Sequence, residues 1–261
     1  MNDHRDDSEA FNKYARTFDK TVGNSPVVRG LRQRVYDEIR RLLPNGGSIL
    51  DINCGTGTDC IALQEMGYRT RGVDLSSEMI QSARRKAPLG SGIGFDVLPF
   101  HRLDEMEANA FDLVLSNNSG LNCADDLCAV LTAVHGRLRT DAHFIGVLMP
   151  PFSLWETTVG LARRDLHHAF RRGKKGVANI GGTPVVVRYY GESDLRRAAS
   201  GLYRVERVLG FNIISPSPNS TDFVERHPNL CRVLAEADDA ISRIPLIRRW
   251  GDQILVVWRK I

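Results

Sequence analysis

Residues 48–59 read SILDINCGTGTD, and this stretch indicates the fold. A short apolar run leads into polar residues and a Gly-x-Gly turn at Gly55 and Gly57, which is typical of a buried strand that enters a tight loop. Thr58 or Asp59 can then cap a helix over the next apolar stretch. The sequence therefore predicts a strand, a tight loop and a helix in close succession.

The same alternation continues downstream. A strand, TRGVDL (70–75), contains Asp74 near its end, and a helix from Ser76 or Ser77 to Pro88 follows, which completes a βαβ unit and predicts a parallel sheet. The later predictions, in chain order, are a strand at 95–100, a strand at 112–117, a helix from Ala124 to about Arg139 with Asp125 and Asp126 in its first turn, a strand at 142–150, a helix over 152–172, strands at 185–190 and 203–214, a helix around 230–241 and a strand at 254–260.

A helix is also predicted before the first strand. Ser25 can cap it, Pro26 suits its first position, and apolar residues repeat every three or four positions until Pro44. The polar arm at 1–24 carries three aromatic residues that fall on one helical face, Phe11, Tyr14 and Phe18.

The composition excludes several classes of protein. With 42% apolar and 25% charged residues the chain is neither collagen-like, coiled-coil nor wholly disordered. It has no apolar run of roughly 18 residues, and its acidic start, MNDHRDDSEA, is unlike a signal peptide, so we expect neither a spanning nor an exported protein. The five cysteines form no Cys-x-x-Cys pair, which favours a reduced, cytoplasmic protein without a zinc site. A net charge of +4 is too small to indicate nucleic-acid binding.

The glycine turn and the two acids predict the ligand. A glycine turn at the end of a parallel strand lets a ligand approach the backbone, and Asp74 at the end of the next strand can accept hydrogen bonds from both hydroxyls of a ribose. These features indicate an adenosine-containing ligand. A dinucleotide fingerprint needs a third glycine where Cys60 stands, and Asp51 would repel a pyrophosphate but suit an ammonium group.

Over roughly residues 11–149 the sequence resembles the class I S-adenosylmethionine-dependent methyltransferases, in particular the small-molecule branch related to the quinone C-methyltransferases. The segments that carry the resemblance are FNKYARTFD, LDINCGTGTD, GVDLSSEMI and FDLVLSN. The resemblance implies an α/β, Rossmann-like fold with a seven-stranded, mostly parallel sheet and helices on both faces. We expect one domain over 1–261, made of a helical arm or lid (1–44), a cofactor-binding core (45–150) and insertions (151–250) that form a substrate lid between late core strands.

The resemblance also implies a set of residues that bind S-adenosylmethionine. Asp51 would organise the methionine end, Asp74 would hold the ribose, Leu75 and Met79 would flank the adenine, and Asn117 would face the sulfonium side. The full expected set is Tyr14, Asp51, Asn53, Cys54, Gly55, Thr56, Gly57, Asp74, Leu75, Met79, His101, Arg102, Leu103 and Asn117.

Two positions depart from the family pattern. Asn53 stands where the family has its first glycine, and we expect it to be tolerated because asparagine enters left-handed backbone conformations more readily than most residues. The acid that usually follows the third strand is absent, since the aligned residues are Phe100, His101, Arg102 and Leu103. Pro99 is expected in that strand, at an edge of the sheet where the missing N–H costs little.

The acceptor of the methyl group is expected to be a small organic molecule that binds beside the cofactor. The candidate acceptor-binding residues are Phe18, Asn118, Ser119, Asn122, Trp155 and Tyr189, and the candidate general bases are His101, His167 and His168. Positioning alone can accelerate methyl transfer, so a base is optional.

The segment 163–175 is basic and amphipathic, and three interpretations of it stay open. It could be a lid with a solvated basic exterior, a docking site for an anionic carrier or an anionic substrate, or a contact with acidic lipid. Two other functions also stay open for the chain: a nicotinamide-dependent oxidoreductase and a non-catalytic cofactor-binding module.

Overall fold

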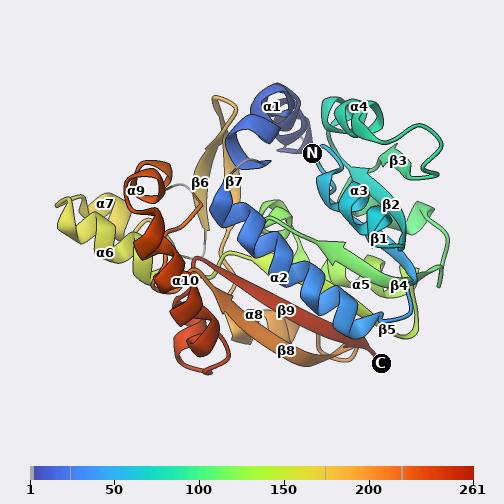
Figure 1. Cartoon of the computed structure of the whole chain (residues 1–261). Coiled ribbons are helices and arrows are strands. Elements are labelled where there is room, and N and C mark those ends of the chain that lie inside the picture. Colours follow the sequence, from blue (N-terminus) through green and yellow to red (C-terminus); the bar gives the residue numbers. More distant parts are fainter. Residues whose placement is uncertain (1–2, 24, 174, 219) are drawn as a thin grey trace.

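The computed structural model describes residues 3–23, 25–173, 175–218 and 220–261, and a seven-stranded sheet forms its centre (Figure 1). The strand order is β3-β2-β1-β4-β5-β9-β8, in which β1 to β5 are parallel and β9 is antiparallel to both neighbours. The strands are β1 (Ser48–Asp51), β2 (Arg69–Asp74), β3 (Gly94–Val97), β4 (Phe111–Ser116), β5 (Leu138–Leu148), β8 (Tyr203–Phe211) and β9 (Gln253–Lys260).

Helices cover both faces of this sheet. On one face, α2 (Pro26–Leu42) and α3 (Thr58–Glu65) pack a cluster that includes Ile39 and Leu63 against the strands. On the other face, α5 (Leu127–Arg137) and α8 (Glu192–Ala198) pack around Trp258 of β9. The helix α4 (Ser77–Lys86) packs against β3 at the edge of the sheet.

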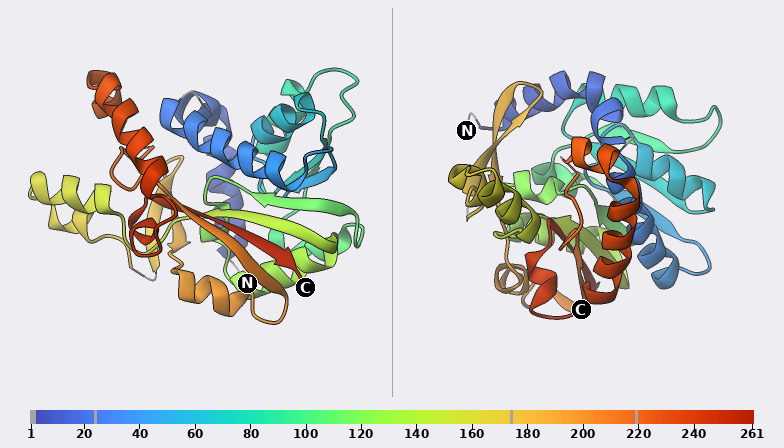
Figure 2. Two further views of the ribbon diagram at one scale, coloured as in Figure 1. Left: turned by 60° about the horizontal axis from the view of Figure 1, so that its bottom comes forward. Right: turned by 60° about the vertical axis from the view of Figure 1, so that its left-hand side comes forward.

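The remaining elements lie around this core. The helix α1 (Asp3–Phe18) continues into the π-helix η1 (Asp19–Gly23) and contacts both α4 and the hairpin of β6 (Lys175–Ile180) and β7 (Thr183–Arg188). The other helices are α6 (Leu154–Ala162), α7 (Leu166–Ala169), α9 (Thr221–Arg226) and α10 (Pro228–Ile241), with 3-10 turns η2 (Phe100–Glu105), η3 (Gly120–Cys123) and η4 (Ile247–Trp250). The pair α6 and α7 projects from the body beside α9 (Figures 1 and 2).

Several predicted boundaries were wrong for local reasons. Gly57, with φ 77°, is the N-cap of α3, so neither Thr58 nor Asp59 caps it. The strand β3 ends at Val97, before Pro99, which precedes a 3-10 turn. Helix α5 begins after its N-cap Asp126, and Arg139 lies in β5.

The region after Pro151 departs further from the prediction. The helix expected over 152–172 is split into α6 and α7 by Arg164, whose φ of 58° is left-handed. The strand predicted at 185–190 lies in the separate hairpin with β6, and β6 itself was not predicted. The seven-stranded sheet is therefore completed by β8 and β9.

Within the part of the chain that the structure describes, no helix is long and apolar enough to span a membrane.

Candidate active site

A cavity of about 1010 Å³ lies where the parallel strands end. The loops after β1, β2, β3 and β4 supply much of its wall, because the carboxyl ends of parallel strands meet at one edge of a sheet. The arm helix α1 covers the cavity with Ser8, Glu9, Phe11 and Asn12. Phe18, the last residue of this helix, also lines the cavity. Charged side chains and aromatic rings therefore face one enclosed space.

Asp74 ends β2 on the wall of this cavity. Its two carboxylate oxygens accept hydrogen bonds from the backbone N–H groups of Gly55 and Ser76, each at 2.9 Å. Burial raises the pKa of Asp74 to about 6, although these N–H groups oppose the shift. Each oxygen keeps a second lone pair, so the carboxylate can accept hydrogen bonds from a ligand.

Two groups of opposite charge lie near the cavity: Arg32 on its wall, and Asp51 buried behind the loop after β1. Burial, followed by the charge of Asp59, raises the pKa of Asp51 well above its ordinary value. Asp51 Oδ1 accepts from the backbone N–H of Asn53, whereas Oδ2 is buried without a hydrogen-bond partner among the described residues. Arg32 from α2 lines the cavity, and its Nε likewise has no hydrogen-bond partner there. Asp51 Oδ2 therefore lacks a hydrogen-bond donor among the described residues, and Arg32 brings a positive charge to the wall of the cavity.

Asp59 holds this arrangement together. Its carboxylate accepts hydrogen bonds from Tyr36 Oη at 2.5 Å and from Asn117 Nδ2 at 3.1 Å, and its Oδ1 lies 3.1 Å from Arg32 Nε as an ion pair. These partners come from α2 and from the end of β4. The network therefore fixes Arg32 relative to the loop after β1.

Asn53 does not use the left-handed conformation that we predicted for it, because it is not among the residues with positive φ. Instead its side chain crosses to the end of β4, where Nδ2 donates to the carbonyl of Asn117 at 2.7 Å and Oδ1 accepts from the hydroxyl of Ser116. Gly120 packs against this side chain, and a Cβ at Gly120 would lie 2.5 Å from Asn53 Cγ. The close approach thus requires a glycine at 120 and not at 53.

The two loop glycines have different roles. A Cβ at Gly55 would approach Phe18 at 3.8 Å, so this position faces the cavity and the arm. A Cβ at Gly57 would lie 2.8 Å from the Cβ of Ala83 and 2.9 Å from the ring of Phe95. Gly57 therefore allows helix packing in the core, and it does not line the cavity.

Polar contacts fasten the arm over the cavity. Asn12 Oδ1 accepts from the hydroxyl of Ser76 at 2.7 Å, and Asp19 accepts from the hydroxyl of Thr56 at 2.6 Å and from Lys86 Nζ at 2.9 Å. These contacts join the arm to α4 and to the loop after β1. Because Asp19 and Lys86 are partly exposed, the arm is held by contacts that can open.

Comparison with known proteins agrees with this geometry. Residues 32–151 match the model of a family described as a methyltransferase domain. The structure superposes on 1,6-didemethyltoxoflavin-N1-methyltransferase from Burkholderia thailandensis with a TM-score of 0.59 and 15% identity, covering 100% of this chain and 91% of that chain. It also superposes on an S-adenosylmethionine-dependent methyltransferase from Mesorhizobium loti with a TM-score of 0.54 and 22% identity, covering 86% of this chain and 96% of that one. The chain has the S-adenosylmethionine-dependent methyltransferase fold.

A curated relative is the biotin biosynthesis bifunctional protein BioHC of Saccharophagus degradans, 27% identical over 175 residues that cover 64% of this chain and 29% of the relative. The chain spans 29%, 31% and 36% of the length of the three curated relatives that it matches. The predicted Rossmann-like fold with a mostly parallel seven-stranded sheet is confirmed.

The methyltransferase fold places about half of the predicted residues on the cavity. The predicted residues that line it are Phe18, Asn53, Cys54, Gly55, Asp74, Leu75, Met79, His101 and Asn118. Three others support it from behind: Asp51, Asn117 and Thr56 are buried next to the lining loops. Tyr14 stacks edge-to-face on Phe18 at 5.4 Å within the arm.

Two predicted cofactor residues do not line the cavity, because the 3-10 turn η2 directs them elsewhere. Leu103 is fully buried in the core against α5, and Arg102 is exposed and paired with Glu105 at 2.5 Å. His101 and Asp104 are the polar side chains of this turn that line the cavity.

Two of the three predicted acceptor residues after β4 have structural roles, whereas Asn118 lines the cavity. Ser119 has a left-handed φ of 64°, and its hydroxyl accepts from Gln253 Nε2 at 2.9 Å. Asn122 is fully buried, where it donates to the carbonyls of Met149 and Arg188. Both residues tie this loop to later strands and do not line the cavity.

The predicted residues beyond 150 do not reach the cavity, since none of the described residues of 151–250 lines it. Trp155 packs on Phe223 at 5.2 Å, and Tyr189 is buried beneath the guanidinium of Arg172. His167 and His168 lie in α7, on the projecting pair of helices. The β6–β7 hairpin of the insertions contacts α1, where its turn at Gly181 packs on Ala10 and Tyr14.

Ion pairs neutralise part of the positive charge of the basic segment 163–175. Arg171 and Arg172 both bind the buried carboxylate of Glu156, and Arg172 also pairs with Asp252 at 2.6 Å. Arg163, Leu166 and Phe170 are exposed on the same projection, and Lys174 lies outside the described residues.

Sequence reasoning missed four residues that build the site: Arg32, Asp104, Asn12 and Asp19. Arg32 and Asn12 lie on predicted helices, where a polar residue is ordinarily solvated. Asp104 gave the clearest available signal, because it is an acid shortly after the third strand.

Proposed function

We propose that this protein is a methyltransferase that transfers a methyl group from S-adenosylmethionine to a small organic acceptor held under the N-terminal arm. The observation that carries the proposal is one cavity lined by Asp74 and Arg32, with the buried Asp51 Oδ2, which has no hydrogen-bond partner among the described residues, behind the lining loop after β1. An α-amino acid attached to a ribose carries the complementary groups. The matches to a methyltransferase domain and fold support the same conclusion.

Each cofactor group has a candidate partner. In this proposal Asp74 accepts from the ribose hydroxyls, Asp51 accepts from the ammonium group and Arg32 donates to the carboxylate. Leu75 and Met79 pack against the adenine. S-adenosylmethionine supplies a methyl group on a sulfonium cation, so the protein needs only to align an acceptor and exclude water, which can contribute about 7–11 kcal/mol.

The walls of the cavity favour a flat, mainly apolar acceptor. Phe11 and Phe18 from the arm and Phe100 from η2 bring three aromatic rings to the cavity, and Ala129, Val130 and Ala133 of α5 add small apolar side chains. Flat rings pack well against such surfaces. The finer assignment to the branch related to quinone C-methyltransferases is part of this proposal. The similar toxoflavin methyltransferase was solved with bound 1,6-didemethyltoxoflavin, which supports a small-molecule acceptor.

His101 is our candidate general base because, of the three histidines considered, it is the one that lines the cavity. A base near its target contributes about 10²–10⁴-fold where the acceptor must lose a proton. His101→Gln should therefore lower turnover more than it weakens the binding of S-adenosylhomocysteine.

Calorimetric titration with S-adenosylhomocysteine tests the proposed function. We expect saturable binding of S-adenosylhomocysteine at micromolar concentration. We expect no binding of NADH, whereas the oxidoreductase alternative requires NADH to bind. Folded protein that gives no heat with S-adenosylhomocysteine up to millimolar concentration refutes the proposal. Methyl transfer is then sought with tritiated S-adenosylmethionine on a panel of quinones, phenols and heteroaromatic rings. Binding without transfer to any of them would favour a non-catalytic module.

Two finer predictions belong to the same proposal. The exposed part of segment 163–175 is a candidate contact for an anionic carrier or acidic lipid, and sedimentation with acidic vesicles measures it. We also propose a cytoplasmic location, because five cysteines without a Cys-x-x-Cys pair do not suggest a disulfide framework. Fractionation of cells measures the location.

A further inference from the structure

A second hollow lies along strand β8, away from the active site. It is an open groove of about 600 Å³, and five of the eight residues that line it are arginines: Arg41, Arg204, Arg207, Arg243 and Arg248. Val208 and Leu209 add apolar surface, and Glu206 is the one acid of the lining. None of these eight residues lines the active-site cavity, so the groove is a separate feature.

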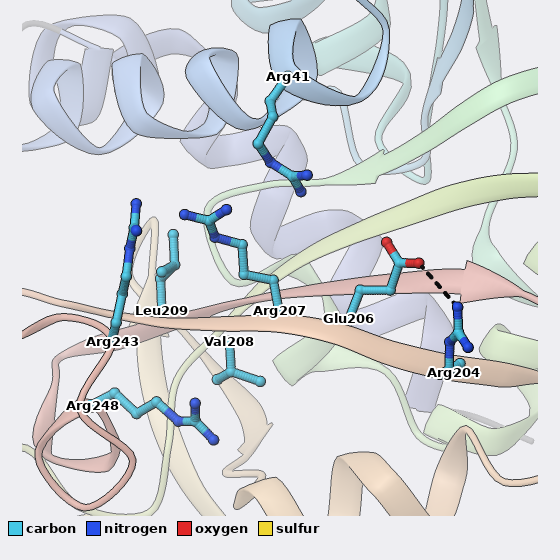
Figure 3. Close-up of a pocket in the computed structure, with 8 residues that line it drawn as sticks. All are labelled: Arg41, Arg204, Glu206, Arg207, Val208, Leu209, Arg243 and Arg248. Atoms are coloured by element: carbon cyan, nitrogen blue, oxygen red, sulfur yellow. Dashed lines mark ion pairs between the residues drawn. The ribbon is translucent and has the colours of Figure 1, made fainter.

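Three arginines come together in this groove from three elements (Figure 3). Arg41 points down from the end of α2, Arg207 rises from β8 toward it, and Arg243 rises beside Leu209 from the segment after α10. Burial, together with the positive charges of Arg243 and Arg41, lowers the pKa of Arg207 even though Glu38 opposes that shift. The three guanidinium groups are therefore close enough to repel one another.

The nearby carboxylates balance only part of this charge. Arg248 forms a bidentate ion pair with Glu192 at 2.6 and 2.7 Å, whereas the other carboxylates are shared. Glu38 is shared by Arg41 at 2.8 Å and Arg207 at 3.1 Å. Glu206 is likewise shared by Arg204 and Arg259, each at 3.7 Å. Arg243 is exposed, and none of the described carboxylates pairs with it. Because each guanidinium has five N–H donors, a shared carboxylate leaves donors free in the groove.

We propose that this arginine groove binds a small phosphorylated molecule with at least two negative charges. A phosphate group presents tetrahedral oxygens and can accept from guanidinium groups on several sides, whereas a single carboxylate accepts mainly in its own plane. The volume lies within the range of small-molecule sites, about 300–1,000 Å³. A nucleic acid needs a larger face, about 1,000–2,500 Å² of buried protein surface, and Glu206 interrupts this one.

Inorganic pyrophosphate is the probe that tests the proposal, in calorimetric titrations of the full chain at constant ionic strength with sodium sulfate as the reference anion. We expect pyrophosphate to bind with a Kd below about 1 mM and more tightly than sulfate, since several charge-assisted hydrogen bonds add. Arg243→Gln should weaken binding about tenfold, the loss expected for one such bond. The variant should fold normally because the side chain is exposed.

Arg226→Gln is the matched control, because Arg226 is also exposed but lies on α9 and not in the groove. It should leave pyrophosphate binding unchanged, and Arg243→Gln should leave S-adenosylhomocysteine binding unchanged. Absence of pyrophosphate binding, or equal losses in both variants, overturns the proposal. Tighter binding of a 12-nucleotide single strand that competes with pyrophosphate overturns it in favour of a nucleic acid. The proposal does not depend on methyl transfer.

Discussion

Replacing Asp74 by asparagine separates the binding role of this carboxylate from its structural role. Asp74→Ala would leave the N–H groups of Gly55 and Ser76 without acceptors, and each buried group of that kind costs about 1–3 kcal/mol. Asparagine has nearly the same shape and keeps an acceptor for one of these N–H groups, so it loses only the other. A carboxylate that accepts from ribose hydroxyls is worth about 1.5–3 kcal/mol, so Asp74→Asn should raise the Kd of S-adenosylhomocysteine about 10- to 150-fold.

The pKa of Asp74 adds a prediction about pH. The pKa is raised to about 6 in the folded protein from an ordinary value of 3.8, so the folded state holds the proton more tightly than the unfolded state. Stability should therefore fall as the pH rises from about 4 to about 6, by about 3 kcal/mol at most. Above that range Asp74→Asn escapes this cost, but it leaves one of the two N–H groups without an acceptor, which costs about 1–3 kcal/mol. Its Tm at pH 8 should therefore stay close to that of the wild type while its ligand binding is weaker.

Titrations with S-adenosylhomocysteine from pH 5 to 8 measure both effects. The affinity of the wild type should fall as the pH drops below about 6, and the part of this fall that Asp74 causes should be absent from Asp74→Asn. Asp96→Asn, on the neighbouring strand β3 and half-exposed, is the matched control. Equal Kd values and equal pH profiles for wild type and Asp74→Asn would refute the placement of the ribose.

Three other substitutions test the site. Gly120→Ala should destabilise the fold by about 1–3 kcal/mol through its clash with Asn53, and Asn53→Gly should recover part of that loss in a double-mutant cycle measured by urea unfolding. Arg32→Gln should weaken S-adenosylhomocysteine but not methylthioadenosine, which lacks the amino acid, and equal losses would contradict a carboxylate contact. Asp19→Asn should speed dissociation of S-adenosylhomocysteine a few-fold in stopped-flow traces, because it removes an exposed ion pair worth about 0.2–1 kcal/mol that fastens the arm.

The positions of Asp74 and of the loop after β1 could be predicted because they depend on chain order alone. A residue that ends a parallel strand lies at the same edge of the sheet as the ends of its neighbours, whatever the rest of the chain does. Leu75 and Met79 were expected from the family resemblance, and both line the cavity because the helix capped by Ser76 begins beside that edge. The structure confirms the fold, and the cofactor contacts themselves remain predictions.

Other features depend on contacts between distant segments, which a single sequence does not record. Arg32 lies on the cavity because Asp59 and Tyr36 hold it there, and its own helix looks like any amphipathic helix. A left-handed conformation was expected for Asn53 because asparagine adopts it more readily than most residues. The glycine that relieves the crowding, Gly120, is far away in the chain, so the sequence alone did not reveal it. The β6–β7 hairpin is different, because the pair Gly181 and Gly182 between two extended runs is a turn signal that could have predicted it.

The charge balance of the cavity leads to a final prediction. Asp51 and Asp74 are buried with raised pKa values, and a ligand that brings positive charge beside them should lower both values. Binding of S-adenosylmethionine at pH 6 should therefore release protons, so the calorimetric enthalpy should change with the ionisation enthalpy of the buffer. Methylthioadenosine has neither the ammonium nor the sulfonium charge and should release fewer protons. An enthalpy that is the same in phosphate, MES and histidine buffers would mean that these carboxylates do not face the ligand's charges, and the proposed orientation of the cofactor would then be wrong.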